Sequence, residues 1–113
     1  MGALRTFEIE VIRLRGESSL DKCQLEALAL ADGAEYEYSG TGYFLTLRLP
    51  ELPTARQTLY DPVVMGKADG IECGFVVFLE QRELMLECHS WGLVDVPNDF
   101  RDRNFVLSTP DIN

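Results

Sequence analysis

The chain has 113 residues, of which 46% are hydrophobic and 26% are charged, a balance typical of a globular protein rather than a disordered or fibrous one. Nineteen acidic residues against ten basic ones give a net charge of −9, with the acids spread along the whole chain. This charge argues against nucleic acid and an anionic membrane surface as partners, because both are polyanions that bind basic patches. It favours a basic protein instead.

The first predicted element is a strand over residues 5–15. Phe7, Ile9 and Val11 alternate with polar residues, which is the period of a half-buried strand. The alternation slips at Ile12 and Leu14, and either a β-bulge or a second buried face near residue 12 would explain the slip.

The second predicted element is a helix over residues 19–31, the main helix of the fold. Ser18 with Asp21 forms a weak capping box, and Gly33 suits the end of the helix. The positions that share one helical stripe, and that we expect to be buried, are Leu20, Cys23, Ala27, Leu30 and Ala31.

The rest of the chain predicts an antiparallel sheet. Prolines punctuate residues 50–70, which form either a functional loop or a loop that hides a short strand in "PVVM". The other expected elements, in chain order, are strands at 34–38 and 43–49 joined by a turn at 39–42, a hairpin at 71–91, a turn at 97–100 and an edge strand at 104–108. We therefore expect a single α+β domain over residues 1–113, with one mostly antiparallel sheet of about five or six strands and one main helix packed on it.

The hairpin can be assigned a register. A four-residue loop at 80–83 places Leu79 opposite Leu84, and then Phe75 opposite Cys88 and Gly74 opposite His89. Side-chain alternation gives one face for the main core, with Cys73, Phe75, Val77, Leu79, Leu84, Leu86 and Cys88. The other face carries Glu72, Gly74, Val76, Phe78, Met85, Glu87, His89 and Trp91.

Adjacent residues of a strand point to opposite sides of the sheet, so Cys88 and His89 cannot form a thiol and imidazole dyad. We expect Cys88 and Cys73 to be buried and reduced, with a disulfide between them poorly placed. No metal site is expected, because one histidine and two core-facing thiols cannot converge on an ion. No cofactor-binding motif is present either.

The candidate ligand or partner surface comprises Glu72, Gly74, Glu87, His89 and Trp91. Gly74 leaves a dent, His89 beside two carboxylates could act as an acid or base, and Trp91 could stack on a planar group. The structural alternative packs Trp91 under the long loop or the helix, with His89 hydrogen-bonded to a glutamate.

The candidate interface is the apolar middle of the same face, made of Val76, Phe78 and Met85. We expect either the helix at 19–31 or another chain to cover this strip. If another chain covers it, the strip becomes the contact between two copies or with a partner.

Three functions remain open. The leading one is a small acidic cytoplasmic binding domain, an inhibitor or immunity-type protein for a basic partner. Cytoplasmic location is expected because no stretch of the chain has the length of a membrane span or an uninterrupted signal-peptide core, and the three cysteines fit no secreted framework. The alternatives are a cofactor-independent enzyme that uses His89 with Glu72 or Glu87 near Gly74, and a structural homodimer with no catalytic role.

Overall fold

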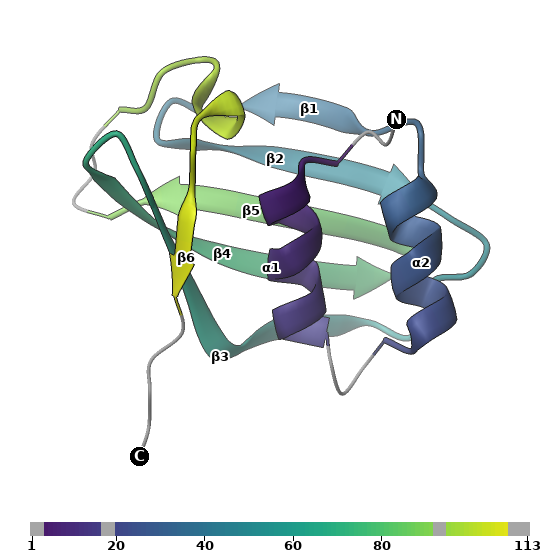
Figure 1. The fold of residues 1–113 in the computed structure, drawn as a ribbon. Helices are drawn as coiled ribbons and strands as arrows, with labels where there is room; N and C mark the ends of the chain where they lie inside the picture. The colour runs from purple at the N-terminus through teal and green to yellow at the C-terminus, as the bar shows by residue number, and fades with distance from the viewer. Residues whose placement is uncertain (1–3, 17–19, 92–94, 109–113) are drawn as a thin grey trace.

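The computed structural model describes residues 4–16, 20–91 and 95–108, and the side chains within them other than those of residues 15–16 and 60–63. Two helices pack on the same face of one antiparallel sheet, as the predicted α+β class requires (Figure 1). The elements are α1 (Thr6–Gly16), α2 (Lys22–Leu30), β1 (Glu35–Tyr38), β2 (Gly42–Arg48), β3 (Gln57–Ala68), β4 (Ile71–Glu80), β5 (Glu83–Ser90), a short 3₁₀ turn η1 (Phe100–Asp102) and β6 (Val106–Ser108).

The six strands lie in the order β1-β2-β5-β4-β3-β6, and every neighbouring pair is antiparallel. The hairpin β4–β5 therefore occupies the centre of the sheet, while β1 and β6 form its two edges. The strands predicted at 34–38, 43–49 and 104–108 are confirmed as β1, β2 and β6. Their ends differ from the predicted ones by two residues or fewer. The turn at 97–100 is also present, with Phe100 N donating to Pro97 O at 3.0 Å.

The strand predicted over residues 5–15 is wrong, because this segment is the helix α1. Its fully buried positions are Glu8, Val11 and Ile12, which recur at the spacing of one helical face. Because Glu8 is an acid on that buried face, the apolar pattern of the helix is interrupted. The alternation of Phe7, Ile9 and Val11 with polar residues is then a coincidence and does not indicate a strand. The predicted bulge at Ile12 disappears with the strand.

The helix predicted at 19–31 is confirmed in kind as Lys22–Leu30, whereas the predicted start at residue 19 and the predicted cap residue Ser18 lie outside the described residues. Asp21 is its N-cap: its side chain accepts from Gln24 N at 2.8 Å and its own N–H donates to the Gln24 side chain at 2.8 Å. The predicted buried stripe is partly wrong, because Cys23 is exposed and Leu30 is 81% exposed. A nine-residue helix that leans mainly on α1 buries only a narrow face, here centred on Leu28.

Residues 50–70 hide a strand rather than forming one long loop. β3 runs over twelve residues and pairs with β4 on one side and β6 on the other. Its register shifts between Leu59 and Val64, and that irregularity spans Pro62, which cannot donate to a ladder. A tight turn at Asp69 and Gly70, both with positive φ (53° and 80°), then leads into β4.

The predicted register of the hairpin is confirmed, with Leu79 opposite Leu84, Phe75 opposite Cys88 and Gly74 opposite His89. The loop is shorter than four residues, because Glu80 and Glu83 also pair. Gln81 and Arg82 alone make the turn, with φ of 49° and 63°, values typical of a two-residue hairpin turn. Backbone bonds from these residues to Thr54 O and Pro53 O hold the turn against the preceding loop.

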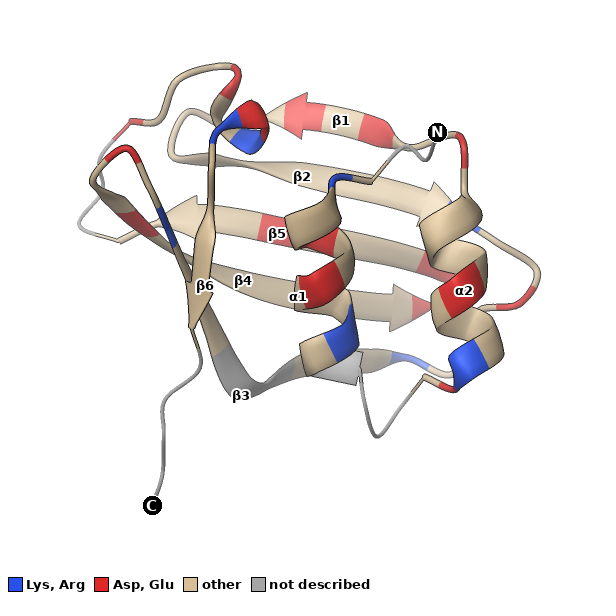
Figure 2. Ribbon diagram, viewed as in Figure 1, with Lys and Arg blue, Asp and Glu red and all other residues tan. Residues whose placement is uncertain are grey.

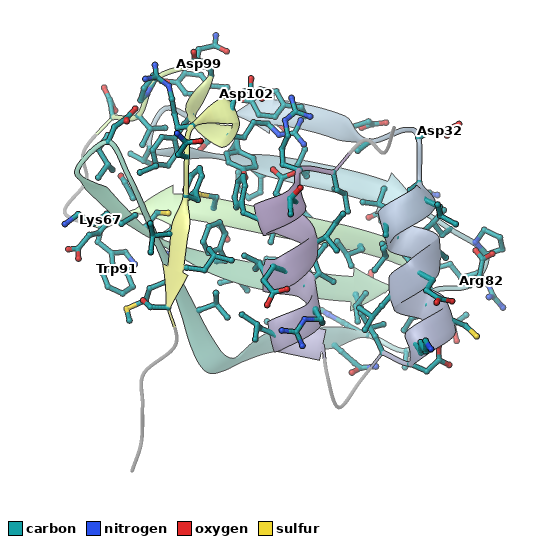
Figure 3. All side chains as sticks on the ribbon, in the orientation of Figure 1. Asp32, Lys67, Arg82, Trp91, Asp99 and Asp102 are labelled. Carbon is teal, nitrogen blue, oxygen red and sulfur yellow. The ribbon has the colours of Figure 1, made fainter. Side chains whose placement is uncertain are left out.

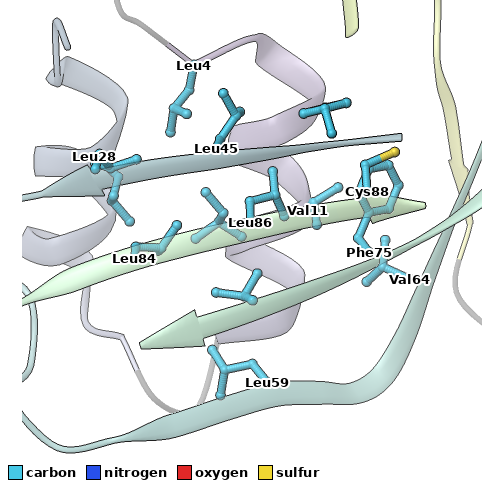
Figure 4. Packing of buried hydrophobic residues seen from close by; sticks show 14 of the residues in the cluster. Leu4, Val11, Leu28, Leu45, Leu59, Val64, Phe75, Leu84, Leu86 and Cys88 are labelled. Atoms are coloured by element: carbon cyan, nitrogen blue, oxygen red, sulfur yellow. The ribbon is translucent and has the colours of Figure 1, made fainter. Parts of the chain in front are cut away.

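The core lies between the sheet and the two helices. Figure 4 shows Leu45, Leu84 and Leu86 of the central strands packed beside Val11 of α1 and Leu28 of α2. The predicted core face of the hairpin is confirmed, since its seven members are at most 1% exposed: Cys73, Phe75, Val77, Leu79, Leu84, Leu86 and Cys88. The helices therefore cover only one side of the sheet.

Candidate functional site

The side of the sheet that faces away from the helices, called the open face below, carries the candidate residues. Neither helix lies on it (Figure 1). One of the two expectations was that α2 covers Val76, Phe78 and Met85. That expectation is wrong, because α2 lies on the other side of the sheet. The side chains that the strand registers place on the open face are Glu35, Glu37, Phe44, Thr46, Arg48, Thr58, Met65, Lys67, Glu72, Val76, Phe78, Glu80, Glu83, Met85, Glu87, His89, Val106 and Ser108.

Three of the candidate residues meet at one end of the open face. His89 lies opposite Gly74, and Trp91 continues the ladder with its N–H donating to Glu72 O at 2.9 Å. The indole of Trp91 lies against Gly74, because a Cβ on that glycine would be only 2.8 Å from the indole nitrogen. The indole thus fills the dent that the missing side chain of Gly74 was expected to leave for a ligand.

His89 makes no hydrogen bond with either candidate glutamate among the described residues. Its Nδ1 is buried and has no hydrogen-bond partner in this part of the chain. His89 also has a glycine on its other side, Gly42, where a Cβ would lie 1.8 Å from the carbonyl oxygen of Cys88. The imidazole therefore stands between two backbone positions that carry no side chain.

A hollow of about 290 Å³ lies beside Trp91, which is 43% exposed. Trp91 and Lys67 lie at the same end of the molecule (Figure 3). The walls of this hollow are Met65, Gly66, Lys67, Glu72, Trp91, Val106 and Ser108. Of the candidate residues only Glu72 and Trp91 line it, so the hollow and the imidazole of His89 do not form one site.

The candidate interface forms a partly exposed apolar strip across the open face. Phe78 lies opposite Met85 on β5. Val76 and Phe78 are two positions apart on β4, so both side chains point to the open face. Phe44 of β2, which the sequence analysis did not single out, extends the strip to a third strand. A second hollow of about 210 Å³ opens over Phe78 and Met85, and Glu80 and Glu83 are among the residues that line it.

Glu87 lies in the middle of this strip, half-buried between Phe44 on β2 and Val76 on β4. Two other glutamates of the open face have cations: Arg48 Nε lies 2.8 Å from Glu83, and Arg56 Nε lies 3.4 Å from Glu80. Within the described ranges, no ion pair is formed by Glu35, Glu37, Glu72 or Glu87. The centre of the strip therefore holds a carboxylate without a cation.

One cluster of charged residues was missed by the sequence analysis, and it lies on the other side of the sheet. The carboxylate of Glu8, fully buried, accepts from Tyr43 Oη at 2.7 Å, from the backbone N of Arg5 at 2.7 Å and from the guanidinium of Arg101. Burial and the neighbouring charge of Glu8 raise the pKa of Tyr43, so the phenol stays protonated. The acid already accepts from three neighbours, which indicates that the cluster joins α1, β2 and η1 rather than binding a ligand.

Cys88 points away from His89 and into the core, as the alternation along β5 predicts. Its hydrogen bond with Cys73 and its burial raise the pKa of the Cys88 thiol. All three cysteines are unpaired, including the exposed Cys23, which was expected to be buried. The thiol of Cys88 is therefore protonated and out of reach of the imidazole.

No protein-family model matches this chain, and neither a curated protein nor a solved structure is significantly similar to it. Among the described residues, no helix combines the length and the apolar composition that crossing a bilayer requires.

Proposed function

We propose that this protein is a small acidic interaction domain that binds a basic protein partner through the open face, as a protein inhibitor would. The observation that carries the proposal is the position of Glu87, a carboxylate without a cation at the centre of an apolar strip. A partner of this kind would explain both the uncovered apolar side chains and the acid among them.

The energetics of Glu87 favour a cationic occupant. A carboxylate on a half-buried apolar surface loses part of its hydration, and that loss is offset only when the charge is paired. A guanidinium from a partner would pair with Glu87 and could lie over the neighbouring ring of Phe44, a contact that attracts cations. The surrounding apolar side chains would then exclude water from the pair, which is the usual setting of an interface hot spot.

The charge of the whole face supports the same class of partner. In the described part of the chain, the strand registers place six glutamates on the open face against the cations Arg48 and Lys67, and Arg56 pairs with one of these glutamates, Glu80. Figure 2 shows acidic positions along β1, at one edge of this face. Such a field speeds encounter with a basic surface and weakens as salt is added.

A second copy of the chain is a poorer occupant of the same surface. Two open faces in contact would bring six glutamates from each copy together, and two of the three cations at each face, Arg48 and Arg56, are already engaged at Glu83 and Glu80. Like charges that meet in a desolvated interface cost several kcal/mol. The homodimer therefore explains the apolar strip but not the acid within it.

Photo-crosslinking tests the proposal in cells. A Phe78→p-benzoylphenylalanine variant places the reactive ketone on the apolar strip, and mass spectrometry identifies what it captures. We expect one adduct with a basic protein, and we expect a second substitution, Glu87→Lys, to remove it. The matched control carries the same probe at Leu30, which is 81% exposed on α2 and should give no such adduct.

Three results would contradict the proposal. They are an adduct of the chain with itself, an adduct that persists in the Glu87→Lys variant, and the same adduct from the probe at Leu30. Circular dichroism of both variants checks that they remain folded, because position 78 is only partly buried.

A further inference from the structure

We infer that the partner adds an extended basic segment as a new strand at the outer edge of β1, next to the open face. The inference rests on the proposed function for the charge of the partner, and it specifies how the partner binds. It depends on three features of β1: an outer edge with which no described strand pairs, its outward backbone groups and the alternation of its side chains.

β1 is an edge strand whose four residues are all exposed. Its hydrogen-bonding pattern follows from Ser39 N, which donates to Gly42 O at 3.0 Å and so closes the turn into β2. Because bonded and non-bonded pairs alternate in an antiparallel ladder, Glu37 and Glu35 direct their backbone groups toward β2. The backbone groups of Tyr36 and Tyr38 therefore point out of the sheet, where a further strand could pair with them.

The bond from Ser90 N to Thr41 O, at 2.7 Å, supports this assignment from the other side of β2. It shows that the odd-numbered residues of β2 bond to β5, which leaves the even-numbered ones, such as Phe44, to bond to β1. In the described part of the chain, no hydrogen bond to the outward groups of Tyr36 or Tyr38 is found.

The side chains of β1 specify what the added strand should carry. Glu35 and Glu37 point to the open face and form no ion pair among the described residues. Tyr36 and Tyr38 point to the helix side, where their hydroxyls donate to the backbone carbonyls of Asn98 and Val96. A strand of alternating basic and apolar residues would place its cations beside the glutamates and its apolar residues beside the tyrosines.

This edge is continuous with the surface of the proposed function. Glu37 lies in one row of the sheet with Phe44, Glu87 and Val76, running from β1 to β4. A cation placed beside Glu37 would extend that row outward by one strand. The same partner could therefore contact Glu87 with one group and the β1 edge with another.

The opposite edge and a second copy are weaker alternatives. β6, at the other edge, has only three residues, Val106–Ser108, and none of them is charged. Two copies paired through β1 with their open faces on one side would place Glu35 opposite Glu37, a like-charge pair that destabilises a ladder. Charge thus selects β1 as the edge and a basic segment as its occupant.

Selectively methylated peptides test the inference. The probe is an amidated peptide of alternating arginine and valine, compared with two versions in which either the valine or the arginine nitrogens are methylated. In an added strand, only every second backbone nitrogen faces β1 and donates a hydrogen bond to it. One methylated peptide should therefore bind about tenfold or more weakly than the parent, and the other should bind as well as the parent. Loss with methylated valine indicates an antiparallel added strand, and loss with methylated arginine a parallel one.

Amide hydrogen exchange by NMR supplies the second readout. The Tyr36 and Tyr38 amides should exchange fast in the free protein and become protected with the parent peptide. Unchanged exchange at these amides, equal binding of both methylated peptides, or no binding of the parent peptide at low salt would overturn the inference. If the peptide instead binds in a way that Glu87→Gln weakens while the tyrosine amides stay unprotected, strand addition fails and the proposed function stands. If the amides are protected and Glu87→Gln has no effect, the proposed role of Glu87 fails and strand addition stands.

Discussion

The carboxylate of Glu8 and the guanidinium of Arg101 form a two-point ion pair under the sheet, with 2.7 Å between Oε1 and Nη2 and 3.0 Å between Oε2 and Nε. The pair joins the first helix to the 3₁₀ turn η1 near the end of the chain. Desolvation opposes it, but the hydrogen bonds and charge of Glu8 raise the pKa of Arg101 on balance. The pair is therefore a fixed tertiary contact.

Removing one partner of this pair should be costly, because it leaves the other charge buried and unpaired. We expect Arg101→Met to lower the free energy of unfolding by about 3 kcal/mol, and Glu8→Met with Arg101→Met together to cost less than Arg101→Met alone. Urea unfolding followed by circular dichroism measures these two variants and Glu8→Met alone. A double variant that costs the sum of the two single substitutions would show that the groups do not interact.

Stability should fall at high pH because Tyr43 and Cys88 keep protons in the folded protein that the unfolded chain releases. Burial and the charge of Glu8 raise the pKa of Tyr43, and the hydrogen bond with Cys73 and burial raise the pKa of Cys88. Both groups hold their protons more tightly in the folded state. The stabilisation is therefore complete below the unfolded pKa values, near 9.0 for the thiol and 10.0 for the phenol, and decreases as the pH rises above them.

Unfolding in urea between about pH 7 and pH 11 checks this dependence, with an expected slope of about 1.4 kcal/mol per pH unit for each group. Cys88→Ala should remove the part that begins near the thiol value, and Tyr43→Phe the part that begins near the phenol value. A wild-type curve without any decline over this range would contradict the assignment.

The three thiols should differ in reactivity. Cys23 is exposed, whereas Cys73 and Cys88 are buried. Iodoacetamide at mildly alkaline pH should therefore modify Cys23 alone in the folded protein and all three cysteines in urea, as mass spectrometry can count. Modification of Cys88 as fast as Cys23 under native conditions would mean that the core opens at this strand.

Two glycines of the sheet should respond very differently to alanine. A Cβ at Gly74 meets the side chain of Trp91, which can move aside, whereas a Cβ at Gly42 meets the backbone of Cys88 at 1.8 Å. Gly74→Ala should displace the indole and shift the fluorescence of the single tryptophan at little cost in stability. Gly42→Ala should cost about 3 kcal/mol or more in urea unfolding. Similar losses for both variants would refute this difference.

The parts of the fold that the sequence predicted depend on local periodicity. The register of β4 and β5 follows from a short turn between two apolar runs. Because neighbouring side chains of a strand point to opposite faces, Cys88 and His89 then lie on different sides of the sheet. α1 was missed because the buried Glu8 interrupts its apolar face, and its partner Arg101 lies 93 positions away, beyond the reach of any local pattern. β3 was not delimited because its irregularity at Pro62 resembles a loop.

The candidate site was predicted in composition but not in arrangement. Side-chain alternation correctly gathered Gly74, His89 and Trp91 at one end of one face. It could not show that the indole occupies the space over Gly74, because that depends on the rotamer of Trp91. Nor could it show that Phe44 joins the strip beside Glu87, because that contact depends on the order of the strands.

In the proposed function, Glu87 makes the open face a site for a basic partner. Calorimetric titration measures this role when the arginine and valine peptide is added to wild type, Glu87→Gln and Glu26→Gln, the last a matched charge removal at an exposed position of α2. We expect Glu87→Gln to weaken binding about tenfold, Glu26→Gln to change it by less than about twofold, and added salt to weaken it in all three. Equal affinity of the Glu87→Gln and Glu26→Gln variants would contradict the claim.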